Sequence, residues 1–192
     1  MSGKTKRNII ALVVVALLCA LDQFTKYLIV ANLQLGEAIP LIEGVFQLRY
    51  IRNEGAAWSI LEGKQIVFII MTPIVLFFFA KMFATLPEEK KFSPVRIILV
   101  FMTAGAIGNL IDRIWGGEVL FKGGVVDFFD FCLINFPVFN VADIYVSLSV
   151  VALFILMIFK YKEEDFDIIY DSCVKFGKKE DASAKDVADE DV

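Results

Sequence analysis

The sequence contains no histidine, and its three cysteines lie far apart, at positions 19, 132 and 173. The absence of histidine excludes a mechanism in which an imidazole acts as general base or metal ligand. The cysteines are odd in number and widely spaced, so they predict neither a disulfide framework nor a metal-binding motif. A serine or cysteine nucleophile would need a base other than histidine.

Apolar residues, in contrast, are abundant. They make up 58% of the 192 residues, 19 of which are phenylalanine, and the mean hydropathy is +0.68. Such a composition is typical of an integral membrane protein. Four stretches, approximately residues 9–31, 66–84, 95–111 and 141–159, are long enough to cross a hydrocarbon core, which requires roughly 20 helical residues. We therefore predict an all-α membrane protein with four transmembrane helices.

The positions of the basic residues predict the orientation of these spans. They precede the first span, flank the connection between the second and third, and follow the fourth: Lys4, Lys6, Arg7, Lys81, Lys90, Lys91, Arg96, Lys160 and Lys162. By the positive-inside rule these regions are cytoplasmic. Both termini are then cytoplasmic, and the loops 32–65 and 112–140 face outward.

Two further segments have a distinct character. Residues 45–51 alternate imperfectly between apolar and polar side chains and end near Gly55, which predicts a small extracytoplasmic β element, a strand or hairpin. Residues 163–192 carry most of the net charge of −4 and are expected to form an acidic, flexible cytoplasmic tail. The four-helix domain would then comprise residues 1–162.

The principal catalytic candidates are Asp127 and Asp143. Asp127 lies in the segment V-V-D-F, and Asp143 lies at the start of the last apolar run. A carboxylate at the mouth of a membrane helix is costly to keep charged, so it is a candidate for function. Two close carboxylates in a poorly hydrated site cannot both ionise easily, and such a pair can activate water and protonate a leaving group.

Other polar residues in the spans have structural interpretations. Asp22 and Lys26 are four residues apart on one helical face, which favours an ion pair. Asp112 and Arg113 are adjacent and could pair at the end of the third span, where Gly105 and Gly108 would permit close helix packing.

Capping and turn formation are further structural interpretations. Asn140 and Asp143 have the spacing of a helix N-cap and its third helical residue, so both could serve only to cap the last span. Residues 53–58, which end at Trp58, could form a turn with an interfacial aromatic anchor. Two noncatalytic functions also fit these residues: a small proton-coupled transporter, and a membrane scaffold in which charges only pair and cap helices.

Five ordered motifs together resemble the lipoprotein signal peptidase family, also called signal peptidase II, which consists of bacterial membrane aspartyl proteases. They cover about residues 9–160 and are D-Q-F-T-K (22–26), N-E-G-A-A-W (53–58), G-N-L-I-D-R (108–113), V-V-D-F (125–128) and F-N-V-A-D (139–143). The stretch between Arg113 and Asp127 is longer than the family usually has, and the acidic tail extends beyond the family core.

The resemblance implies specific roles and partners. Asp127 and Asp143 would be the catalytic dyad; Asn53, Asn109, Arg113 and Asn140 would line or support the site; and Asp22, Lys26 and Asp112 would be structural supports. The implied substrates are prolipoproteins carrying a diacylglyceryl-modified cysteine, cleaved on the amino side of that cysteine. We expect a monomer in the bacterial cytoplasmic membrane, in contact with membrane lipids, with its active site near the extracytoplasmic face. We expect no metal, organic cofactor or nucleic acid to take part.

Overall fold

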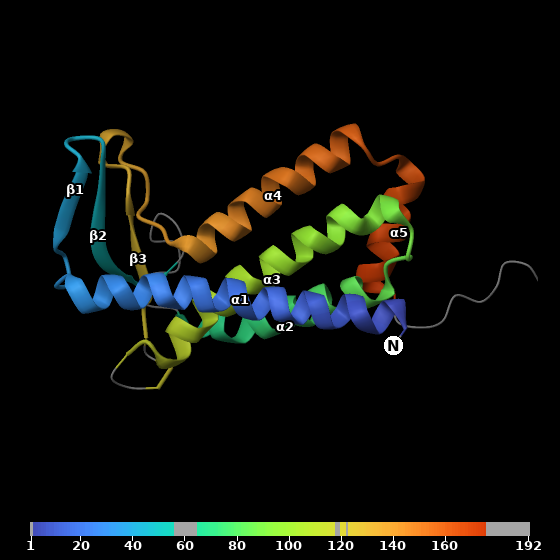
Figure 1. The fold of residues 1–192 in the computed structure, drawn as a ribbon, viewed down its shortest axis with the longest axis horizontal. Helices are drawn as coiled ribbons and strands as arrows, with labels where there is room; N and C mark the ends of the chain where they lie inside the picture. The colour runs from blue at the N-terminus through green and yellow to red at the C-terminus, as the bar shows by residue number, and fades with distance from the viewer. Residues whose placement is uncertain (1, 56–64, 118–119, 122, 176–192) are drawn as a thin grey trace, which may run out of the picture.

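The computed structural model describes residues 2–55, 65–117, 120–121 and 123–175. Its elements, in chain order, are α1 (Gly3–Asn32), β1 (Ala38–Ile42), β2 (Phe46–Asn53), α2 (Gln65–Thr85), the 3₁₀ helix η2 (Lys90–Phe92), α3 (Ser93–Trp115), β3 (Val125–Asp130), the 3₁₀ helix η3 (Cys132–Ile134), α4 (Val141–Phe159) and α5 (Glu163–Val174). Figure 1 shows an elongated helical bundle with the strands at one end and α5 at the other.

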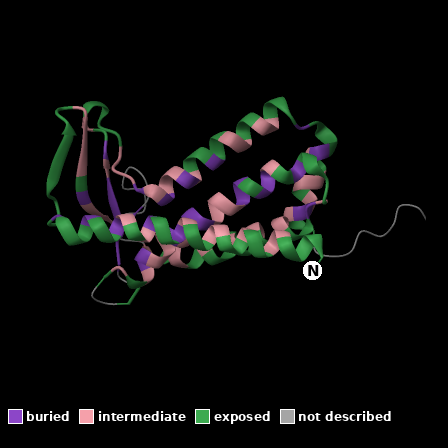
Figure 2. Ribbon diagram, in the orientation of Figure 1, coloured by how far each residue is buried: buried purple, intermediate pink, exposed green. Residues whose placement is uncertain are grey.

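The four predicted spans are confirmed as α1, α2, α3 and α4. Within the described ranges, these are the four helices long and apolar enough to cross a membrane. Much of their surface is exposed, as Figure 2 shows, and α2 has no buried residue at all. This pattern is expected of helices whose outer faces contact lipid instead of protein.

Helix α3 lies at the centre of the bundle, and α1, α2 and α4 each pack against it. Two of its glycines allow this close packing. A Cβ atom on Gly105 would lie 2.6 Å from the carbonyl oxygen of Ala142 in α4, and one on Gly108 would lie 2.5 Å from Oδ2 of Asp22 in α1. The prediction of tight packing at these glycines is therefore confirmed.

The strands form one antiparallel sheet in the order β1-β2-β3. The predicted β element is confirmed by β1 and β2, whereas β3 was not anticipated and comes from the second outward segment. Ile51 pairs with Asp127, and Asn53 pairs with Val125. Because alternate residues of a strand share a face, Asn53 and Asp127 become diagonal neighbours on the same side of the sheet.

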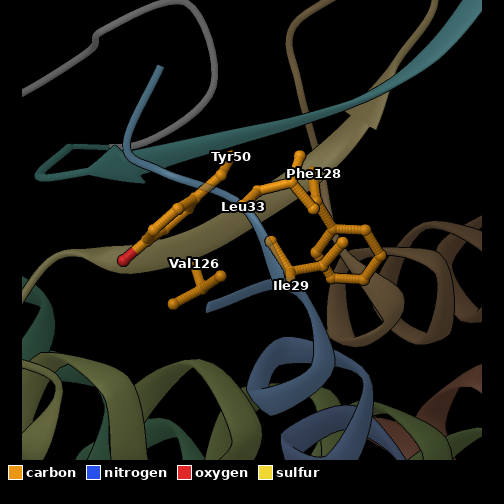
Figure 3. Close-up of a cluster of buried hydrophobic side chains, with 5 residues drawn as sticks. All are labelled: Ile29, Leu33, Tyr50, Val126 and Phe128. Carbon is orange, nitrogen blue, oxygen red and sulfur yellow. The ribbon is translucent and has the colours of Figure 1, made fainter. Parts of the chain in front are cut away.

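An apolar cluster joins this sheet to the bundle. Ile29 and Leu33, at the end of α1, pack against Tyr50 of β2 and against Val126 and Phe128 of β3 (Figure 3). All five side chains are buried. Val126 and Phe128 alternate with Asp127 along β3, so burying this face directs Asp127 to the opposite one.

The opposite end of the bundle corrects one expectation. Residues 163–174, expected to belong to a flexible tail, form the helix α5. Its apolar side chains, among them Phe166 and Ile169, pack against a cluster that includes Phe92 and Tyr161. Asp165 also pairs with Lys91 at 2.7 Å. The apolar side chains of residues 163–174 have helical spacing, so this segment forms a packed helix despite its acidic composition. Residues 176–192 of the expected tail lie outside the described ranges.

Candidate active site

Asp127 lies in the middle of β3 and is almost completely buried, with 1% of its surface exposed. Both of its carboxylate oxygens accept hydrogen bonds from amide side chains. Asn140 donates from Nδ2 to Oδ1 at 2.6 Å, and Asn53 donates from Nδ2 to Oδ2 at 2.9 Å. Asn53 is itself oriented by a bond from the backbone N–H of Gly55 to its Oδ1 at 2.9 Å.

Asp143 lies in the first turn of α4 and is half-buried. Its Oδ2 accepts a hydrogen bond of 3.1 Å from the backbone N–H of Asn140, and the Asp143 N–H donates to Oδ1 of Asn140 at 3.0 Å. These reciprocal bonds form a capping box, as the three-residue spacing predicted. The other oxygen, Oδ1, accepts a 2.8 Å bond from Nδ2 of Asn109.

Asn109 and Asn140 connect the two aspartates. Oδ1 of Asn109 accepts bonds from Nδ2 of Asn140 and from Nζ of Lys26, both at 3.0 Å, while its Nδ2 donates to Asp143. Asn140 contacts Asp127 through Nδ2 and Asp143 through Oδ1 and the backbone. The two acids are therefore held by one continuous amide network.

The pKa of Asp127 is raised from 3.8 to about 7, chiefly by burial and secondly by the nearby charge of Asp143. Hydrogen bonds from Asn53 and Asn140, and the charge of Lys26, act in the opposite direction but do not cancel the effect of burial. A carboxyl group that titrates near neutrality can both hold and release a proton under physiological conditions.

Arg113 supports the site from α3. One guanidinium nitrogen donates to the carbonyl oxygen of Asn109 at 3.2 Å, and another donates to that of Gly55 at 3.1 Å. The guanidinium also lies over the ring of Phe68, 4.8 Å from its centroid. Arg113 thus connects α3, α2 and the end of the strand segment that carries Asn53.

A buried ion network lies beneath the amide network. Lys26 contacts Asp22 and Asp112, each at 2.8 Å, which confirms the predicted pair with Asp22. Asp22 also accepts a 3.0 Å bond from the backbone N–H of Ala142 in α4, and Asp112 accepts a 3.2 Å bond from that of Val126 in β3. The network therefore connects α1 and α3 to the two segments that carry the aspartates.

The expectation that Asp112 pairs with Arg113 is wrong, because Asp112 turns toward Lys26 of α1. Adjacent residues of a helix point in different directions, so sequence proximity did not favour contact. Sequence reasoning also missed Gln23, whose Nε2 donates to the Gly108 carbonyl oxygen and to Asp112 Oδ1, both at 3.1 Å. Its one available signal was its place in the D-Q-F-T-K motif.

The remaining candidates concern the outward loop and metal binding. Residues 56–58, which complete the N-E-G-A-A-W motif, lie outside the described ranges. Within those ranges, no group of three or more His, Cys, Asp or Glu side chains has an arrangement suited to a metal ion. The site that the structure does bring together consists of two acids, three asparagines and the ion network behind them.

Comparison with known proteins yields a consistent set of relatives. Residues 14–159 match the family described as signal peptidase (SPase) II. The chain is 44% identical over 137 residues to the lipoprotein signal peptidase of Brevibacillus brevis, covering 71% of this chain and 87% of that protein. It is 40% identical over 158 residues to the one from Enterococcus faecalis, covering 82% and 93%. A solved structure described as a bacterial membrane enzyme aligns with a TM-score of 0.67 and 30% identity, covering 80% of this chain and 92% of that one.

Proposed function

Because this chain belongs to the signal peptidase II family, we propose that Asp127 and Asp143 are the catalytic dyad with which it acts as a lipoprotein signal peptidase. The family consists of aspartic peptidases in bacterial membranes, and prolipoproteins are its substrates. The assignment of this dyad is supported by the shared amide network, in which Asn140 contacts both acids at the N-terminal end of α4.

The environments of the two acids favour different roles. The pKa of about 7 and the near-complete burial of Asp127 make it the member that carries the proton. Asp143 is more exposed, lies at the positive end of the α4 dipole and accepts bonds from Asn109 and Asn140, an environment that suits the base of the pair. Separate environments of this kind assign an acid and a base to a pair of carboxyl groups.

Hydrolysis of the peptide bond then proceeds in two steps. Asp143 removes a proton from water as the water oxygen attacks the scissile carbonyl carbon, and Asp127 donates its proton to the carbonyl oxygen, which forms a neutral tetrahedral diol. When the diol collapses, the carbon–nitrogen bond breaks, a proton from Asp143 passes to the departing amine and a hydroxyl proton returns to Asp127. Both acids regain their starting states.

The asparagines and Arg113 position this pair. Asn53 and Asn140 hold the two oxygens of Asp127, and Asn109 holds Asp143. Arg113 fixes Asn109 and Gly55 through their backbone carbonyls. The ion network of Lys26, Asp22 and Asp112 serves as the structural support below them.

The placement of the site suits a lipid-modified substrate. The acids lie where the sheet meets the bundle, at the opposite end from the chain's N-terminus (Figure 1). A diacylglyceryl-modified cysteine could keep its acyl chains in lipid while the peptide reaches the dyad, with cleavage on the amino side of the cysteine. The basic residues near the N-terminus and η2 support a cytoplasmic position for that end and an extracytoplasmic position for the dyad.

The test is cleavage of a purified diacylglyceryl-modified prolipoprotein, with the product mapped by mass spectrometry. We expect wild type to cleave immediately before the modified cysteine and Asp127→Asn and Asp143→Asn to be inactive. Full activity in either folded variant would remove that aspartate from the mechanism. Equal cleavage of the unmodified precursor would contradict the proposed substrate requirement.

A further inference from the structure

A cavity of about 500 Å³ lies far from the dyad, at the end of the bundle that contains the N-terminus. Its walls come from the first turns of α1, the end of α2 and the start of α3. Most of the lining is apolar and includes Ile10, Val14, Phe83, Val100 and Phe101. This volume is in the range of small-molecule sites, roughly 300–1,000 Å³.

A second cavity, of about 220 Å³, adjoins the first and shares Ala11, Phe83 and Val100 with it. The two lie where α1 and α2 flank α3. Both helices pack against α3, whereas within the described residues their backbones stay apart from each other; the guanidinium of Arg7 in α1 lies over the ring of Phe83 in α2, 5.5 Å from its centroid. The two cavities therefore form one apolar groove with two branches, and α3 forms its base. A branched apolar molecule could fill this groove.

The larger cavity has a charged end. Arg7, Arg96 and Glu88 line it together, so two cations accompany one anion. Arg7 pairs with Glu88 at 2.5 Å, while Arg96 donates to the carbonyl oxygens of Leu86 and Pro87 at 2.8 and 2.6 Å. The Nε–H groups of both arginines are buried and have no partner. Arg96 is itself only 6% exposed.

These unpartnered donors point to an anionic group. A buried N–H without an acceptor is costly, and a guanidinium is well suited to phosphate oxygens. Ser93, the first residue of α3, also lines the cavity, and the positive end of the helix dipole lies there. The charged end of the apolar groove is therefore net positive, because it combines two cations and a helix N-terminus with a single carboxylate.

We propose that this groove binds one anionic phospholipid, with its phosphate at Arg7 and Arg96 and its two acyl chains in the adjoining cavities. The chemistry disfavours the other obvious apolar occupant, the signal peptide of a substrate, because such peptides begin with a basic segment that two arginines would repel. This groove lies at the end of the molecule opposite the dyad, so lipid binding there does not depend on the catalytic assignment.

The experiment measures lipid binding to the detergent-purified full-length chain by native mass spectrometry. The probes are dioleoyl phosphatidylglycerol, dioleoyl phosphatidylcholine with the same chains, and inorganic phosphate. We expect saturable binding of phosphatidylglycerol, at least fivefold weaker binding of phosphatidylcholine and no competition by phosphate. Comparable affinity for both lipids, or displacement by phosphate, would overturn the proposal.

Four variants locate the site. Arg7→Gln and Arg96→Gln should each weaken phosphatidylglycerol binding by about fivefold, the contribution of one basic residue near an anionic lipid. Glu88→Gln, which removes the competing carboxylate, should strengthen it. Lys6→Gln is the matched control: it removes a neighbouring charge from α1 that does not line the cavity, and it should change the Kd less than twofold. Equal effects of the Lys6 and Arg7 substitutions would show general surface attraction and overturn the proposal.

Arg96 also holds the α2–α3 connection, so its substitution can disturb folding. Ala11→Phe provides an independent measurement, because Ala11 lines both cavities and lies outside the charged end. The larger side chain should occupy the groove and reduce phosphatidylglycerol binding while prolipoprotein cleavage in detergent stays near wild type. Unchanged lipid binding by folded Ala11→Phe would contradict the proposal, as would competition by a synthetic signal peptide.

Discussion

Asn140 donates a hydrogen bond of 2.6 Å from its side-chain nitrogen to Oδ1 of Asp127. The same residue is the N-cap of α4, and it exchanges two further bonds with Asp143. The start of the last membrane helix and the geometry of the proposed dyad are therefore set by one side chain. Capping and a place in the proposed site are therefore compatible, although the sequence presented them as alternatives.

The two roles of Asn140 can be separated by substitution. Asn140→Ser keeps an oxygen that can cap α4 but removes the donor to Asp127, a bond that lowers the pKa of that carboxyl. We expect a melting temperature near wild type, about tenfold lower activity and a high-pH limb of the activity profile that moves upward. Asn140→Ala should additionally lose about 1 kcal/mol of stability. A serine variant with a wild-type pH profile would show that Asn140 acts only as a cap.

The proposed catalytic pair can be tested against a neighbouring aspartate. Asp127→Asn and Asp143→Asn should each lower the rate of prolipoprotein cleavage by at least about 10³-fold, because each removes one member of an acid–base pair. Asp130→Asn is the matched control: Asp130 is a buried aspartate of the same strand, but it accepts a 2.6 Å bond from Gln47. This control should retain most of its activity, and comparable losses in all three variants would indicate general disruption of β3.

The raised pKa of Asp127 predicts how stability depends on pH. An acid with a pKa of about 7 in the folded chain, against an ordinary value of 3.8, favours folding most when it is protonated. Its contribution is therefore full below about pH 4, declines as the pH rises to about 7 and is constant above that. Asp127→Asn should gain stability relative to wild type across this window. Thermal unfolding in detergent between pH 4 and 8 measures the difference, and a pH-independent difference would contradict the burial argument.

The buried ion network should contribute strongly to stability. Lys26→Met leaves Asp22 and Asp112 buried without their shared cation, so we expect a loss of about 3–5 kcal/mol. Lys175→Met is a suitable control because Lys175 also pairs with an aspartate four residues away, Asp171, but at an exposed position. It should leave the melting temperature unchanged. Similar melting temperatures for both variants would show that the buried network is not a structural support.

The proposed orientation in the membrane can be tested with native cysteines. Cys132 lies in η3 beside the sheet, and Cys173 lies in α5 at the other end; both are half-buried. A membrane-impermeant maleimide added to intact spheroplasts should label Cys132 and spare Cys173, and lysis should expose the latter. Cys132→Ser and Cys173→Ser identify the labelled position. Labelling of Cys173 and not of Cys132 in intact spheroplasts would show that the orientation is the opposite of the one proposed.

Local patterns in the sequence predicted much of the fold. The four spans, the capping box at Asn140 and the Asp22–Lys26 pair all depend on residues within one helix or one turn, where hydropathy and fixed spacing are informative. The helix formed by residues 163–174 was not predicted, because the acidic composition of the segment was given more weight than the helical spacing of its apolar side chains.

Contacts between distant segments were less accessible. The strand β3 is short, and its partner β2 precedes it by more than seventy residues, so no local pattern indicated their pairing. The contact of Asp112 with Lys26, in place of Arg113, likewise depends on how α1 and α3 pack. Asp127 and Asp143 were nevertheless proposed as candidates, because a charged group at a membrane boundary is costly and because both lie in motifs that resemble the family.

The construction of the site from four separate segments determines when it can first form. Asn53 belongs to β2, Asn109 to α3, Asp127 to β3 and Asp143 to α4, the last membrane helix. During synthesis, a chain that has inserted only its first three spans has neither Asp143 nor the Asn140 donor to Asp127. On the proposed assignment, the site is therefore complete only when the fourth helix has joined the other three.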